Sequence, residues 1–111
     1  MNQTGKDVSI NKAISLLNNG HIKKSLEETL RARKKYPDEP LIFNLLGVLY
    51  SQIGNYEDSI KNYSKAIKLN PSYFEAYNNI GVAYTSWSKP NKAIECFDRA
   101  IQINLSLIHI S

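Results

Sequence analysis

Only a few side chains in this chain of 111 residues are of the types that carry catalysis or bind metals, and their spacing does not bring them together. The two histidines, His21 and His109, share no motif with each other or with the single cysteine, Cys96. The sequence has no phosphate-binding glycine loop, no His-Glu-x-x-His zinc motif and no nucleophile elbow. Adjacent acids such as Glu27-Glu28 point to neighbouring parts of a helix surface rather than to one point. We therefore predict a protein that is not an enzyme and that holds no cofactor or metal.

The composition predicts one compact domain outside the membrane. Hydrophobic residues make up 42% of the sequence, which is enough to build a core. No apolar run approaches the roughly 18 residues that a transmembrane helix needs. Residues 1–6 lead into a polar stretch rather than the apolar segment of a secretion signal. We therefore expect a cytoplasmic protein with no membrane partner.

The net charge of +4 is uneven, and its densest basic run contains Arg31, Arg33, Lys34 and Lys35. This run has two interpretations, a nucleic-acid-binding patch and the end of a helix. Cations stabilise the last turn of a helix by about 0.3–1 kcal/mol each. Pro37 follows two positions after Lys35, as is common after a helix end. We favour the helix end and do not expect nucleic acid as a partner.

The elements that would position any site follow from an internal repeat with a period of 34 residues. The matching pairs include Gly47 and Gly81, Val48 and Val82, Tyr50 and Tyr84, Ile60 and Ile94, Ala66 and Ala100, and Asn70 and Asn104. Three blocks share this period, residues 6–39, 40–73 and 74–104. Apolar residues at steps of three and four predict two helices in each block.

Small residues within the predicted helices indicate close helix packing. Gly47 and Gly81 fall in mid-helix, where glycine costs about 1 kcal/mol relative to alanine. This cost is understandable if another helix passes close to each glycine. Bulky residues such as Tyr63 and Phe97 would then fill the space beside them, and neighbouring pairs would have to stack to bury their apolar faces.

These residues carry a resemblance to a known family. In the second block the relevant residues are Phe43, Leu46, Gly47, Tyr50, Gly54, Tyr56, Ser59, Tyr63, Ala66 and Pro71. In the third they are Tyr77, Ile80, Gly81, Tyr84, Ala93, Phe97 and Ala100. The pattern resembles the tetratricopeptide repeat. The resemblance implies an all-α fold, a right-handed superhelical stack of about six helices in antiparallel pairs, spanning residues 6–104 as one domain.

The resemblance also implies a function, which is a protein–protein interaction scaffold that binds a peptide segment. In this family the first helix of each repeat lines a concave groove. The groove residues that we predict are Asn11, Asn44, Val48, Gln52, Glu75, Asn78, Asn79 and Val82. Asparagine suits this role because its amide group both donates and accepts hydrogen bonds. The alternative for the asparagines is that they only solvate a helix face.

Co-chaperones of this family hold the terminal carboxylate of heat-shock chaperones with lysine, asparagine and arginine side chains. The matching positions here are Ile10, Ile14, Leu45, Glu75 and Asn79. None of them is a cation, and Glu75 would repel a carboxylate. We therefore predict that the chain does not bind chaperone tails.

The last residues do not continue the repeat. Leu105 stands where proline is expected, and residues 105–111 form a short apolar tail that resembles a translated sequencing adaptor. We expect that the reading frame ends artificially near Asn104 and that the native protein continues. The alternative function is then a substrate-selecting N-terminal region of a larger enzyme, such as a glycosyltransferase or a sulfotransferase. An uncapped C-terminal repeat face would also favour self-association.

Overall fold

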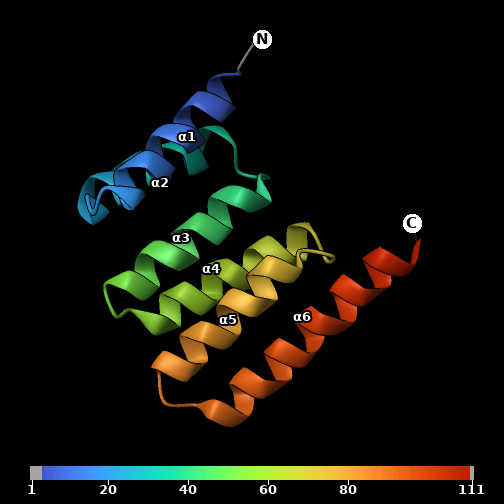
Figure 1. Ribbon diagram of the computed structural model, residues 1–111. Helices are drawn as coiled ribbons and strands as arrows, with labels where there is room; N and C mark the ends of the chain where they lie inside the picture. The colour runs from blue at the N-terminus through green and yellow to red at the C-terminus, as the bar shows by residue number, and fades with distance from the viewer. Residues whose placement is uncertain (1–3, 111) are drawn as a thin grey trace.

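The computed structural model describes the backbone of residues 4–110 and the side chains of residues 4–108. Within this range the chain forms helices and no strands (Figure 1). The helices are α1 (Gly5–Asn18), α2 (Ile22–Lys35), α3 (Pro40–Gln52), α4 (Tyr56–Leu69), α5 (Phe74–Ser86) and α6 (Pro90–Ile110). They form three antiparallel pairs, stacked in chain order, and the predicted all-α stack of helix pairs is confirmed.

The helices begin at residues that satisfy or remove free backbone N–H groups. Thr4 and Asp7 form a capping box at the start of α1. Asn55 accepts a hydrogen bond from the backbone N–H of Asp58 at 3.3 Å, as expected from its place before α4. Pro40 and Pro90 are the first residues of α3 and α6, where the missing N–H costs nothing.

The turns within the three pairs share one backbone conformation. Gly20 and Gly54 both have a φ angle of +81°, which glycine adopts without strain. In the third pair Ser88 occupies this position with a φ of +60°. Trp87, the residue before it, stacks on Tyr56 and Tyr84 with ring centroids 6.3 Å apart in each pair. In the turn between α5 and α6, the strained residue Ser88 therefore lies next to the stacked ring of Trp87.

Within the second and third pairs, a mid-helix glycine allows the two helices to approach. A Cβ atom added at Gly81 would lie 2.6 Å from the ring of Phe97, closer than real side chains come. A Cβ atom at Gly47 would collide in the same way with the ring of Tyr63. The two contacts are one period apart, so the predicted close approach is confirmed.

A buried serine joins the two helices in the first two pairs. The Ser25 hydroxyl donates to the backbone oxygen of Ala13, and the Ser59 hydroxyl donates to that of Gly47, both at 2.6 Å. Both serines are fully buried. In the third pair Ala93 takes this position, so that pair is held without the hydroxyl contact.

The stack buries a core that runs between the pairs. One cluster joins Ile10 of α1, Ala32 of α2, Leu46 of α3, Ala66 of α4 and Ala76 of α5. Among the described residues, helices contact only their neighbours or the next helix but one, and α6 contacts only α5. None of these helices combines the length and the hydropathy that crossing a bilayer requires.

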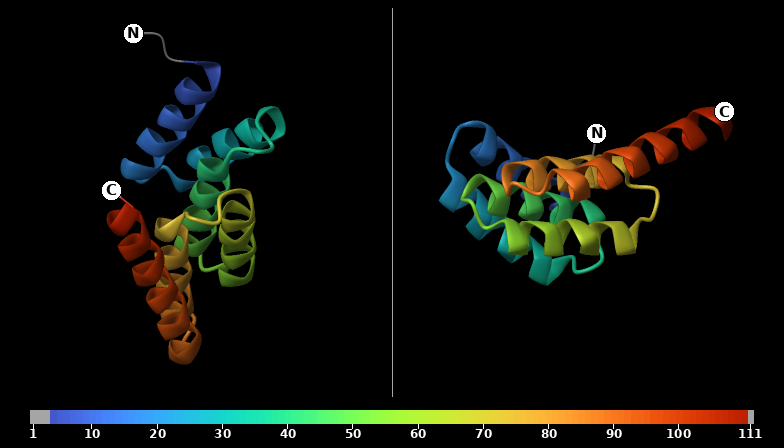
Figure 2. Two further views of the ribbon diagram at one scale, coloured as in Figure 1. Left: turned by 90° about the vertical axis from the view of Figure 1, so that its right-hand side faces the viewer. Right: turned by 90° about the horizontal axis from the view of Figure 1, so that it is seen from below.

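Helix α6 continues past Asn104, where the last repeat was expected to end, and its final turns project beyond the other helices (Figure 2). Leu105, Leu107 and Ile108 are between 42% and 61% exposed. The helix continues because Leu105 replaces the proline that would have stopped it.

Candidate functional site

The predicted groove residues lie on three helices that come first in their pairs. Asn11 lies on α1, Asn44, Val48 and Gln52 lie on α3, and Glu75, Asn78, Asn79 and Val82 lie on α5. All eight are at least partly exposed. Ile10 and Leu45, which the resemblance also assigns to this face, are only 4% and 6% exposed. Their side chains belong to the hydrophobic core and are not available to a partner.

A hydrogen bond connects two of these residues across the stack. The Asn79 side-chain nitrogen donates to the Asn44 side-chain oxygen over 3.1 Å, which joins α5 to α3. The Asn44 amide nitrogen and the Asn79 oxygen keep hydrogen-bonding capacity beyond this contact. The pair therefore has a structural role and can still offer a donor and an acceptor.

The Tyr73 side chain lies at the start of α5, next to this pair. Burial raises the pKa of its phenol, and the nearby carboxylates of Glu75 and Glu39 raise it further. A hydrogen bond with Asn44 acts on the pKa in the opposite direction. Glu39 forms an ion pair with Lys6 at 3.1 Å. The carboxylates of Glu39 and Glu75 thus both lie near Tyr73, at the start of α5.

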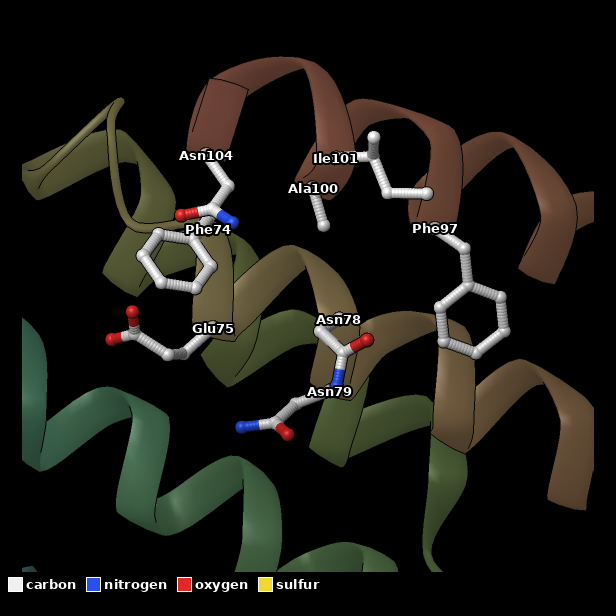
Figure 3. Close-up of a pocket in the computed structure, with 8 residues that line it drawn as sticks. All are labelled: Phe74, Glu75, Asn78, Asn79, Phe97, Ala100, Ile101 and Asn104. Carbon is white, nitrogen blue, oxygen red and sulfur yellow. The ribbon is translucent and has the colours of Figure 1, made fainter. Parts of the chain in front are cut away.

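A pocket with a volume of about 540 Å³ lies between α5 and α6 (Figure 3). It is lined by Phe74, Glu75, Asn78, Asn79, Phe97, Ala100, Ile101 and Asn104. Three of these, Glu75, Asn78 and Asn79, are predicted site residues. Asn11, Asn44, Val48, Gln52 and Val82 are not part of its lining.

The other lining residues were not predicted as site residues. The repeat instead indicated that Phe97 packs between the paired helices. Residues 34 positions earlier, such as Tyr63 and Ala66, are buried beneath the next pair. No later pair covers α6 in the structure, so the equivalent face of α6 is open. The pocket could therefore have been predicted from the 34-residue period.

The remaining titratable candidates do not form a reactive site. Burial raises the pKa of the Cys96 thiol, and the charge of Glu95 raises it further, so the thiolate is disfavoured. His21 is exposed in the turn before α2. The side chain of His109 lies outside the described residues. Within the described part of the chain, no three metal-binding side chains gather in one place.

The fold defines the chain as an α-helical repeat protein, and comparisons with known families agree. The family model described as "TPR repeat" matches residues 49–86, and that described as "Tetratricopeptide repeat" matches residues 74–106. The chain belongs to the tetratricopeptide repeat family. No curated protein matches the chain in sequence.

Solved structures with the same arrangement of helices are available, although their sequences are distant. The crystal structure of MamA matches with a TM-score of 0.86 and 20% identity, covering 96% of this chain and 62% of that chain. The second TPR of Spaghetti (RPAP3), bound to the HSP90 peptide SRMEEVD, matches with a TM-score of 0.81 and 22% identity, covering 88% and 91%. The Sgt2 TPR domain from Aspergillus fumigatus matches with a TM-score of 0.85 and 18% identity, covering 92% and 68%. The chain thus spans less than two thirds of the MamA structure.

Proposed function

We propose that the chain is a protein-interaction scaffold that binds a peptide segment along the first helices α1, α3 and α5. The observation that carries this proposal is the pocket beside Glu75, Asn78 and Asn79, which combines apolar walls with polar side chains. Ligand sites commonly have this composition, because apolar surface supplies affinity and a few polar groups fix orientation. A structure of the same fold is bound to an HSP90 peptide, which shows that this architecture can hold a segment of another protein.

The experiment is a selection of random linear peptides displayed on phage, with the purified chain as bait. Asn78→Ala should weaken the selected peptides, because it removes a side chain that can both donate to and accept from a peptide backbone. Asn91→Ala is the matched control, since Asn91 is also an exposed helical asparagine but lies outside the pocket. A chain that enriches no peptide, or that loses affinity equally in both variants, would remove this proposal.

The nature of the groove residues also predicts what the chain does not bind. The peptide SRMEEVD is acidic, and Glu75 would repel it. Ile10 and Leu45, at two of the positions that hold chaperone tails in related proteins, are buried. We expect no binding of this peptide by calorimetry, and tight binding would contradict the assignment.

We further propose that the chain self-associates through the outer face of α6. Ile94 and Leu105 are 56% and 59% exposed on this helix, and α6 contacts only α5 among the described helices. Exposed apolar surface of this kind favours association because burying it releases water. Sedimentation equilibrium tests this proposal: the average mass should rise with concentration, and Ile94→Asp, a change outside the pocket, should return it to that of a monomer. A constant monomer mass would overturn it.

A further inference from the structure

The charged residues of the chain are not distributed evenly between the helices. Helices α3 and α5 have 13 residues each, and Glu75 is the only charged side chain in either. The cations lie mainly on the second helices of the pairs. Helix α2 carries Lys23, Lys24, Arg31, Arg33, Lys34 and Lys35, and α4 carries Lys61, Lys65 and Lys68. Helices α3 and α5, which carry most of the predicted groove residues, are therefore uncharged except at Glu75.

Glu75 is not neutralised within the part of the chain that the structure describes. There the ion pairs involve Glu28, which contacts Lys12 and Arg31, and Glu39, which contacts Lys6. No cation among the described residues lies within ion-pair distance of Glu75. Its negative charge acts on the neighbouring Tyr73, whose phenol pKa it helps to raise.

The surroundings of this carboxylate suit the rest of a long cationic side chain. The pocket beside Glu75 has apolar walls formed by Phe74, Phe97 and Ile101. Lysine and arginine place their methylene groups on apolar surface while their charged ends stay solvated or paired. Aromatic rings also attract cations by about 0.5–1 kcal/mol at exposed sites. An acidic side chain would gain none of these contacts and would be repelled by Glu75.

We propose that the segment bound at this surface carries an arginine or lysine, which pairs with Glu75 while its methylene groups lie against the apolar wall of the pocket. This inference rests on the proposed function and deepens it, because it states the chemistry of the partner. The partner is a basic peptide segment. Asn78 and Asn104, whose side-chain oxygens can accept hydrogen bonds, line the same pocket and could bind the remaining N–H groups of the cation.

The peptide selection described above supplies the test. The enriched peptides should share a lysine or arginine at one aligned position. The most enriched peptide is then measured by fluorescence anisotropy against two variants, Glu75→Gln and Glu57→Gln. The second variant is a matched control, because Glu57 and Glu75 are both exposed acids at the second position of a helix. Both changes remove one negative charge from a first turn.

Glu75→Gln should weaken binding about fivefold, because the amide oxygen still accepts a hydrogen bond and only the charge of an exposed ion pair is lost. Glu57→Gln should change the affinity less than about twofold, as an exposed charge outside the site. Glu75→Lys should reverse the preference, so that the selection enriches acidic peptides.

The outcomes separate this inference from the proposed function. Peptides that are enriched without a shared cation would leave peptide binding standing and overturn the role of Glu75. Equal losses in the two glutamine variants would overturn it as well. A selection that enriches no peptide would overturn the proposed function itself, and this inference with it. Far-UV circular dichroism of each variant confirms that a loss of binding is not a loss of fold.

Discussion

The effect of the close packing between α3 and α4 can be measured at Tyr63. Its ring lies against Gly47, and the side chain is only 3% exposed. Burial raises the pKa of its phenol well above the ordinary value of 10.0, while a hydrogen bond with Ser59 partly opposes the shift. A phenol whose pKa is higher in the folded state than in the unfolded state makes stability depend on pH.

We expect the free energy of unfolding to be insensitive to Tyr63 below about pH 10 and to fall as the pH rises further. The sign follows because the unfolded chain releases the proton near pH 10, whereas the folded chain holds it to higher pH. Urea denaturation at several alkaline pH values measures the effect. Tyr63→Phe should flatten the pH dependence, and an identical slope in both proteins would contradict the assignment.

Ser88 gives a second prediction at the scale of single residues. It has a φ of +60°, a conformation that costs a residue with a Cβ atom about 1 kcal/mol, whereas Gly54 occupies the same place in the previous pair. Ser88→Gly should therefore raise the free energy of unfolding by about 0.5–1 kcal/mol, and the reciprocal change Gly54→Ser should lower it by a similar amount. Thermal and urea denaturation test both. Changes of the same sign in the two variants would show that backbone strain is not the cause.

The sequence allowed some of these details to be predicted and not others. A glycine in mid-helix has a propensity cost, so Gly47 and Gly81 indicated a close contact before the structure was known. The acceptors of Ser25 and Ser59 could not be predicted, because they depend on the register between two helices and a hydroxyl group can bond in many ways. The eight predicted groove residues followed from the family resemblance. The pairing of Asn44 with Asn79 required the relative position of α3 and α5.

At the scale of the elements, the crossing of α5 over α6 depends on Gly81. Gly81→Ala would place a methyl group 2.6 Å from the Phe97 ring. Crowding of this kind costs about 1–3 kcal/mol, which exceeds the roughly 1 kcal/mol that alanine gains in helix propensity. We expect a lower urea midpoint with an unchanged slope. The double variant Gly81→Ala/Phe97→Leu should recover part of the lost stability, because leucine is smaller and more flexible than phenylalanine. A urea midpoint of Gly81→Ala equal to that of the parent protein would contradict the steric explanation.

The end of α6 is the element on which the structure and the sequence prediction differ. Leu105 and Leu107 are exposed, and α6 packs only against α5. Removing residues 105–111 should therefore change the free energy of unfolding by no more than about 0.5 kcal/mol, as expected for exposed residues. Chemical denaturation followed by circular dichroism measures this. A large loss of stability would mean that the last turns of α6 belong to the folded array.

For the whole molecule, the important feature is that contacts within the described range are local. No described helix contacts another more than two positions away in chain order. Stability in such arrays is approximately a sum of terms within each repeat and between neighbours. Binding at the pocket between α5 and α6 should accordingly have little effect on α1 and α2. This locality also explains why the fold could be predicted from a short period, since no distant pairing had to be inferred.

The uneven charge has a consequence for how a partner first meets the protein. Residues 1–39 contain eight Lys and Arg against five Asp and Glu, whereas residues 74–111 contain three of each kind. The net positive charge of the chain is therefore concentrated on the first repeat. The field of this charge acts over about 8 Å at physiological ionic strength and turns charged molecules before they touch. A segment with a basic part and an acidic part would approach with its acidic part toward α1 and α2, so that its direction along the stack is selected during the encounter itself.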